Sequence, residues 1–476
     1  MLNKSLFEQH YFINTGKIQD NWTESISFLP FTTNNGSSGY DQTCGLSGIT
    51  GEFFRKCSTV EIKPIANYKD HLSSPLRSYL LDQCSMRSNE VDDFMNVVKD
   101  ILFPDSTLHI VDTSFLPYIP LVEEEIKDSR LGKRYKDGQK KLAEYLYSIL
   151  DIQNHKFTST ADENMNLFCS CVKNGMDKGR LSNPDTEGKY YILPFIKKLF
   201  NVDLDWLLQK EDYVIIKNIN NLLHFYLCLS LSQTIAHIVH WEQFTCTDIV
   251  PFYYMLSSEH ASRSREVVLN GWEKWISREA LQKLFGRTQA LDIFNTLVGE
   301  KVGLYSQLID KLGEESFESN KTVCSEVLEE YKTNKIELLS QRKNINVNDL
   351  KQDFDCTVSS YRDFFKKMTS LCTALQSPDF NTRLENRVND LFQIKLLENR
   401  RGMRVLTLDE ELLVFLIAMI TKEKKTKLDK VYSLFREYGI FFDISTRMLI
   451  ENYLKKMNLI ESKSDSGEAQ YVTVIL

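Results

Sequence analysis

A nuclease-like arrangement of charged residues occurs in the segment "PDSTLHIVDTSFLPYIPLVEEEIK". Restriction-type nucleases hold Mg²⁺ between an Asp that follows a Pro and the Glu of a Glu-x-Lys strand, and the Lys assists the attacking water. Asp105, Glu125 and Lys127 stand in that order. Pro117 and Pro120 interrupt the expected second strand, however, and proline cannot donate a hydrogen bond to the ladder of a central strand. We therefore favour a chance match and keep a metal-dependent nuclease as the alternative function.

Two histidines in "TIAHIVHWEQF" have a spacing that could bind a metal ion. His237 and His240 are three residues apart, so on a helix they share a face, and His224 or Cys246 could complete a ligand set. The surrounding residues are apolar, which favours histidines that are hydrogen-bonded within a core. The chain contains no Cys-x-x-Cys pair that would strengthen a zinc site. We expect no metal and no other cofactor.

The loop-like segment "FTTNNGSSGYDQTCGLSGITGEFF" is rich in glycine and could suggest phosphate binding. A phosphate-binding loop ends in Gly-Lys-Ser/Thr, so that backbone N–H groups and the lysine meet the phosphates. Here Gly45, Gly48 and Gly51 are followed by Glu52, and Gly-Lys-Ser/Thr occurs nowhere in the chain. We predict a loop with short extended pieces and no nucleotide site.

A third candidate combines basic and aromatic residues in "PFYYMLSSEHASRSREVVLNGWEKW". Arg263, Arg265 and Lys274, with Trp272 and Trp275, could contact an anion or a nucleic acid. Exposed arginines on a helix–loop–helix are the more ordinary interpretation, which we favour. With no catalytic set remaining, the sequence favours a protein without enzymatic activity.

Composition narrows the class of protein further. The chain has 476 residues, 42% of them hydrophobic, which is typical of a globular protein. The net charge of −7 argues against nucleic-acid binding over the whole surface, so any DNA contact must be local. We see no signal peptide and interpret the longest apolar runs as buried helices, so we expect a cytoplasmic protein with no membrane partner. The ten cysteines have no regular spacing and are expected to be reduced thiols.

Helical periodicity dominates the middle of the chain and predicts a mainly α fold. "NEVDDFMNVVKDILF" places Val91, Phe94, Val97, Val98 and Ile101 on one stripe, and similar segments follow it. We predict an irregular, mixed N-terminal segment at 1–89, a large helical body at 90–402, and a compact C-terminal domain at 403–476.

The C-terminal domain is predicted to contain three helices and a hairpin. Thr407 with Glu410 has the spacing of a capping box for a first helix. Thr426 and Ser445 are the expected caps of a second helix, which ends at Gly439, and of a third helix. The segment "LIESKSDSGEAQYVTVIL" then predicts two short strands around a Ser-Asp-Ser-Gly turn.

This order of elements resembles a winged helix-turn-helix, in which the third helix enters the major groove of DNA and the hairpin touches the backbone. The resemblance places Arg447, Asn452, Lys455 and Lys456 at the groove, with Lys463 and Ser464 on the wing. Lys424 and Lys425, in the loop "KEKKTK", could add phosphate contacts. From Met403 onwards, however, basic and acidic residues are equal in number, 11 of each. Contact with double-stranded DNA and docking of a protein therefore both remain open.

Over nearly its whole length the chain resembles the DptG family of bacterial DNA phosphorothioation-dependent restriction proteins. The resemblance rests on the opening "MLNKSLFEQHYFINTGKIQDNW", on "DTSFLPYIPLVEEEIKD" and on "FYYMLSSEHASRSR". It implies a cytoplasmic subunit of an antiviral defence complex that attacks DNA lacking the phosphorothioate mark. It also implies two larger partner proteins that carry ATPase motifs, which agrees with the absence of a phosphate-binding loop here. The resemblance assigns no catalytic residue in this chain.

Overall fold

The computed structural model describes most of the chain, and the account below is limited to those residues. They are 2–11, 27–34, 36–39, 45–58, 61–105, 107–122, 129–151, 167–176, 190–299, 303–340, 354–374, 378–462 and 470–476. The fold is mainly helical, which confirms the predicted class.

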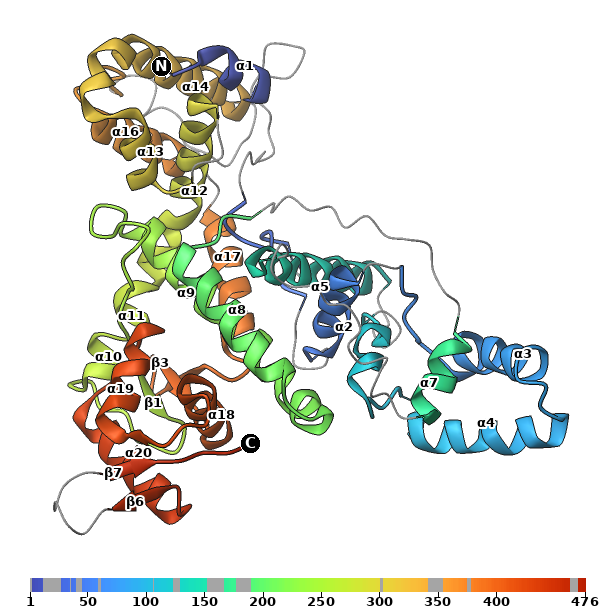
Figure 1. Ribbon diagram of the computed structural model, residues 1–476. Helices are drawn as coiled ribbons and strands as arrows, with labels where there is room; N and C mark the ends of the chain where they lie inside the picture. The colour runs from blue at the N-terminus through green and yellow to red at the C-terminus, as the bar shows by residue number, and fades with distance from the viewer. Residues whose placement is uncertain are drawn as a thin grey trace.

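An N-terminal arm projects to one side of the molecule (Figure 1). Its short helices have a hydrophobic core of their own, built around Leu76, Val98 and Phe115 and separate from the main core. The elements of the arm are the π-helical turn η1 (Lys69–Ser73), α3 (Ser74–Asp82), α4 (Ser88–Leu102), the 3₁₀ helix η2 (Thr113–Tyr118) and α7 (Leu167–Asn174).

Four helices form the centre of the molecule, next to the arm (Figure 1). They are α2 (Ser47–Cys57), α5 (Ser129–Ile149), α8 (Pro194–Leu208) and α9 (Asp212–Val239). By length and composition α9 is apolar enough to cross a membrane, but its most apolar stretch is entirely buried in the fold. A helix that is apolar all round is what the centre of a large core requires.

Helix α2 corrects the prediction of a loop for the glycine-rich segment from Ser47 onward, whereas 36–39 form turns as expected. Its glycines lie where neighbouring backbone comes close: a Cβ on Gly51 would lie 2.5 Å from the carbonyl oxygen of Ile119. A Cβ on Gly48 would lie 2.5 Å from the side-chain oxygen of Gln139 on α5. The small residues are therefore contact points between packed elements, which local sequence cannot distinguish from breakers of structure.

A helical lobe lies at the end of the molecule opposite the C-terminal elements (Figure 1). Its longest helices pack around Phe294, Tyr331 and Phe364, which are completely buried. The lobe comprises α1 (Lys4–Tyr11), α12 (Arg278–Val298), α13 (Tyr305–Leu312), η3 (Glu314–Ser316), α14 (Phe317–Ser340) and α16 (Tyr361–Ala374), and α17 (Pro378–Phe392) leads from it back to the centre.

A four-stranded sheet joins the body to the C-terminal elements. Its order is β2-β3-β1-β5, and β1 is parallel to both β3 and β5. The predicted boundary at 402/403 lies in the tight turn between β2 and β3, so strands from both sides of it share this sheet. The strands are β1 (Phe252–Leu256), β2 (Leu397–Arg400), β3 (Met403–Leu408) and β5 (Ile440–Phe442), and two short helices, α10 (Glu266–Leu269) and α11 (Trp272–Trp275), follow β1.

The remaining C-terminal elements form a compact unit, which we call the C-terminal module. A second sheet, with antiparallel order β4-β7-β6, packs beside three helices. The elements are α18 (Glu410–Thr421), β4 (Thr426–Lys427), α19 (Leu428–Glu437), α20 (Ile444–Lys456), β6 (Ile460–Ser462) and β7 (Gln470–Val472).

The three predicted helices of the module are present, but they begin at other caps than expected. The carboxylate of Asp409 accepts from the backbone N–H of Leu412, and that of Asp443 accepts from the N–H of Thr446. Thr407 lies in β3 and Thr426 in β4 instead. Several residues near the start of a helix can act as its cap, so the sequence alone does not identify the one that does. The threonines expected as caps lie in strands and are not available for this role.

Candidate functional site

The candidate site is α20, the third helix of the C-terminal module, which an ionic clamp holds against the body. Arg265, in the loop after β1, donates to both carboxylate oxygens of Asp443, at 2.9 and 2.6 Å, and to the hydroxyl of Thr446 at 2.8 Å. The same guanidinium donates to Glu259, whose side chain is buried, at 2.6 Å. Burial alone would raise the pKa of Asp443, but the hydrogen bonds from Arg265 and Thr446 hold it below its usual value. The start of α20 is thus fixed in place by residues far away in the sequence.

This clamp corrects the interpretation of the basic and aromatic segment before it. Arg263 is exposed as expected, but Arg265 is not, and Trp272 and Trp275 are buried. The indole N–H of Trp275 donates to the carbonyl of Pro251 at 2.7 Å. The tryptophans therefore belong to the core, and no stacking platform for bases is formed by them.

Arg447 does not face outward as the DNA-reading prediction requires. Its Nε donates to the carbonyl of Phe442 at 3.1 Å, and its guanidinium lies 5.1 Å from the centre of the Tyr432 ring. A cation held over an aromatic ring and a carbonyl serves the packing of α20 on α19. The sequence periodicity placed this residue on the exposed face, but the direction of its side chain depends on contacts with the neighbouring helix.

The other predicted groove residues of α20 are at the surface. Asn452, Lys455 and Lys456 are exposed on its last two turns. Lys455 forms an ion pair with Glu451, which also accepts from Gln470 at 2.7 Å. Only part of the predicted positive charge is therefore available to an outside partner.

The loop before β4 has two cations at its surface and two charged residues turned inward. Lys424 is exposed, whereas Lys425 pairs with Glu461 and lies over the ring of Tyr471. Lys422 and Glu423 contact the body instead, through Asp203 and Lys210 respectively.

The predicted wing residues Lys463 and Ser464 lie outside the described residues.

An apolar stripe on α20 was not anticipated from the sequence. The side chains of Ile444, Met448 and Leu449 are 79%, 60% and 43% exposed. Ile450 and Leu454 are buried, whereas Met457, which continues their i, i+4, i+7 spacing, is 54% exposed. The helix therefore has apolar residues on two faces, and the stronger i, i+3, i+4 pattern of the buried face concealed the other one.

The nuclease-like residues form no site in the described part of the chain. Asp105 is exposed and accepts from the hydroxyl of Thr107 at 2.6 Å, with His109 3.0 Å away. Pro117 lies in the 3₁₀ helix η2 and not in a strand. Glu125 and Lys127 lie outside the described residues.

The histidines of α9 are part of the core. Both ring nitrogens of His237 lie within hydrogen-bonding distance of carbonyls, those of Gln233 at 2.7 Å and Asp248 at 3.1 Å. Burial lowers the pKa of His237 and also that of His224, to about 4. Among the described residues there is no group of three His, Cys, Asp or Glu side chains that could hold a metal ion.

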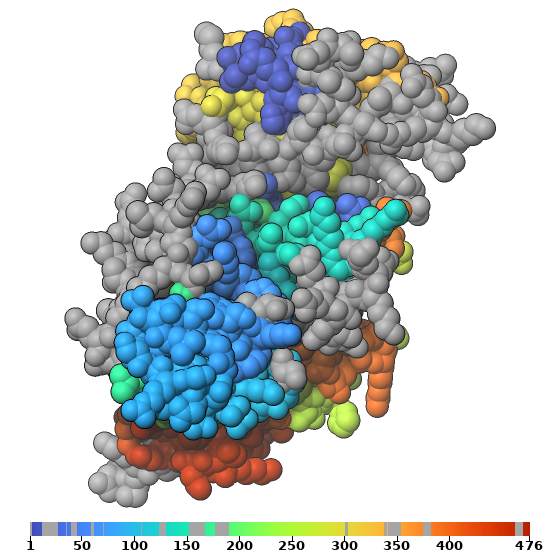
Figure 2. Space-filling view, turned by 90° about the vertical axis from the view of Figure 1, so that its right-hand side faces the viewer, coloured from blue at the N-terminus to red at the C-terminus, as the bar shows by residue number. Residues whose placement is uncertain are grey.

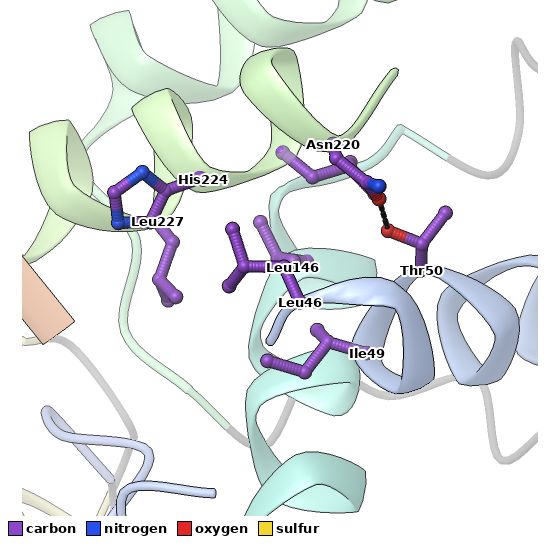
Figure 3. Close-up of a pocket in the computed structure, with 8 residues that line it drawn as sticks. Leu46, Ile49, Thr50, Leu146, Asn220, His224 and Leu227 are labelled. Atoms are coloured by element: carbon purple, nitrogen blue, oxygen red, sulfur yellow. Dashed lines mark hydrogen bonds between the residues drawn. The ribbon is translucent and has the colours of Figure 1, made fainter. Parts of the chain in front are cut away.

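A small pocket lies between α2, α5 and α9 (Figure 3). Its volume of about 10 Å³ is room for about one water molecule, and most of its lining is aliphatic, including Leu46, Leu146 and Leu227. Its polar groups are Thr50, which donates to Asn220, and the ring of His224, which lies 2.9 Å from the carbonyl of Leu391. The lining contains no pair of acid and base, so the pocket resembles a packing defect more than an active site.

Comparison with known proteins leaves the assignment to the site itself. No protein-family model matches the chain. No curated protein matches it at a significant level.

Proposed function

We propose that the C-terminal module is a winged helix. Its order of elements supports this: helix α18, strand β4, helices α19 and α20, and then the hairpin of β6 and β7. The sheet order β4-β7-β6 puts the first strand beside the last, as a winged helix requires. In such a domain α20 is the element that faces a binding partner.

We further propose that α20 docks a protein, and that the chain is a non-catalytic subunit of an assembly. The exposed apolar stripe of Ile444, Met448 and Leu449 is the observation that carries this proposal. Large apolar side chains grouped on the partner-facing helix of a domain are typical of protein contacts, whereas DNA contact needs several free cations at the same place. Lys455 and Lys456 border the stripe, so the expected partner surface is apolar with carboxylates at its edge.

The resemblance to the DptG family indicates which assembly this would be. We propose a cytoplasmic restriction complex that attacks DNA lacking phosphorothioate marks, with one of the two ATPase partners bound at α20. The absence of a Gly-Lys-Ser/Thr sequence in the chain supports a division of labour in which the partners hydrolyse ATP.

The test combines purified partners with variants of α20. Replacing Met448 and Leu449 with Glu should abolish co-elution with the partner, because two carboxylates would be buried against an apolar surface. Val97→Glu is the matched control, since Val97 is also an exposed aliphatic residue on a helix, 48% exposed on α4. Thermal unfolding should show both proteins folded. Undiminished co-elution of the double variant would rule out docking through α20.

A cellular assay tests the proposed pathway. A host strain that carries the restriction genes should take up unmarked plasmid poorly only when this chain is present. The double variant at Met448 and Leu449 should restore uptake, and Val97→Glu should not. If deletion of the chain leaves the exclusion of unmarked plasmid intact, the restriction role is wrong.

Contact between α20 and double-stranded DNA is the second candidate function. The exposed Asn452, Lys455 and Lys456 favour it. Lys424, in the loop before β4 of the same module, is also exposed. Replacing Lys455 and Lys456 with Glu should then weaken DNA binding and reduce its dependence on salt. Equal binding by the variant and the wild type would reject this candidate.

A further inference from the structure

The outer face of α5 is the most strongly basic surface among the described helices. Its exposed residues are all charged, and five of the six are Lys or Arg: Arg130, Lys133, Arg134, Asp137, Lys140 and Lys141. With 100° per residue they occupy about 120° of the helix circumference and about 16 Å of its length. We call this surface the α5 stripe.

Four of the five cations of the stripe are available for an outside partner. Within the part of the chain that the structure describes, Lys133, Arg134, Lys140 and Lys141 form no ion pair. The acidic residues that precede the helix, 123–125, lie outside the described residues. Four free positive charges on one face stand out in a chain whose net charge is −7.

Helix α5 holds the stripe rigidly. Its opposite face is buried in the main core through Leu142, Tyr145 and Leu146. Beside the stripe, Gly138 allows the loop at 36–39 to approach: a Cβ there would lie 2.5 Å from the backbone nitrogen of Gly39. Figure 2 shows the teal side chains of α5 at the surface, on the face turned to the viewer.

We infer that the α5 stripe binds the phosphate backbone of double-stranded DNA. The unpaired cations run from Lys133 to Lys141, about 12 Å along the helix, and a row of this kind matches the repeated charge of a nucleic-acid backbone. Contact with phosphates needs no base readout, so the absence of a specific motif is no obstacle. This site is on a different element from α20 and does not depend on the proposed function of the C-terminal module.

The chemistry of the stripe favours a duplex over other polyanions. Single strands are bound by stacking of bases on exposed aromatic rings, but Tyr135, Tyr145 and Tyr147 of α5 are buried. Anionic membranes are bound by helices that insert large apolar residues next to their basic face. No exposed large hydrophobic residue lies on α5. A rigid, purely charged face fits the outside of a duplex.

The test is a salt series of duplex DNA binding by the full chain, wild type against Lys133→Ala/Lys140→Ala/Lys141→Ala. Each phosphate contact contributes about 0.9 to the slope of log K against log salt. Four contacts predict a loss of affinity of roughly 100-fold between 50 and 200 mM salt, and the triple variant should lose two to three units of slope.

The matched control removes three exposed lysines elsewhere. Lys217→Ala/Lys283→Ala/Lys321→Ala changes the net charge by the same amount on α9, α12 and α14, where these side chains are 67%, 47% and 48% exposed. This control should keep the wild-type slope.

Several outcomes would overturn the inference. They are failure of the wild type to bind duplex DNA at 50 mM salt, equal slopes for the α5 variant and the wild type, and equal losses in the α5 and control variants. Preferential binding of duplex RNA or of anionic vesicles would also overturn it. A loss caused only by Lys455→Glu/Lys456→Glu would move the DNA contact to α20.

Discussion

Removal of the Asp203 carboxylate should loosen the C-terminal module from the body. Asp203, on α8, is completely buried and accepts from the hydroxyl of Tyr438 at 2.8 Å and from that of Tyr226. Its other oxygen is paired with Lys422, at the end of α18. One side chain thus connects α8 and α9 with the helices of the module.

The magnitude follows from the groups that Asp203→Ala leaves without a partner. Each of the two buried hydroxyls loses its acceptor, at about 1–2 kcal/mol each. Lys422 loses its counter-ion, but its side chain is 26% exposed and can be rehydrated in part, so we add only about 1 kcal/mol. The total is about 3–5 kcal/mol. Burial raises the pKa of Asp203, and the contacts with Lys422 and the two tyrosines oppose this effect only in part. Keeping the carboxylate charged therefore costs free energy in the folded protein. Asp203→Asn, which keeps an acceptor, should therefore lose only about 1–2 kcal/mol.

Urea unfolding followed by circular dichroism measures both variants, and hydrogen exchange read by mass spectrometry locates the change. Peptides of α8, α18 and α19 should exchange faster in Asp203→Ala, while those of α14 should not change. Val202→Ala, at a position 52% exposed on the same helix, should stay within about 0.5 kcal/mol of the wild type. Equal losses for the Ala and Asn variants, or exchange that is faster throughout the chain, would refute this account of the carboxylate.

Two further predictions concern single positions in the core. Gly439 has a φ of +73° and a Cβ there would lie 2.5 Å from Nε2 of Gln233, so Gly439→Ala should lower the free energy of unfolding by about 2 kcal/mol or more. Gly402 has a φ of +79° with open space around it, so Gly402→Ala should lose about 1 kcal/mol from backbone strain alone. If thermal unfolding shows equal losses for the two variants, the steric argument is wrong. His224 has a pKa lowered to about 4 by burial, so its contribution to stability is present above the unfolded value of 6.5 and is lost as the pH falls through about 4. The full loss amounts to about 3 kcal/mol of stability. Urea midpoints measured between pH 7 and 4 should therefore fall less steeply for His224→Gln than for the wild type. Parallel curves for the two proteins would show that other groups control the acid sensitivity.

Much of the secondary structure could be predicted from periodicity, because helices reveal their buried face locally. The burial of Val91 and Val98 follows from spacing alone, but Val97 and Ile101, on the same predicted stripe, are 48% and 41% exposed. Met457 shows the same limit: its spacing continues that of the buried Ile450 and Leu454, but it follows the last turn of α20 and is 54% exposed.

The candidate sites were harder to predict, because a surface cation can bind an outside partner only if no carboxylate of the same chain is paired with it. The cations of α5 are visible in "RLGKRYKDGQKK", as are those of "KEKKTK". What separates them is pairing: Lys425 meets Glu461, whereas Lys140 and Lys141 meet no acidic group in the described chain. Arg447 was assigned to a DNA surface and lies over Tyr432 instead.

By itself the sequence determined the helical class, the order of three helices and a hairpin at the C-terminal end, and the lack of a phosphate-binding loop. These properties depend on residue type and local spacing, both of which are present in a short segment of sequence. Only the tertiary structure decided that β1 joins β3 and β5 in one sheet, and that Arg265 clamps the start of α20. It also decided which face of α20 is apolar and which cations of α5 are free. Each of these depends on residues far apart in the sequence that meet only when the chain is folded.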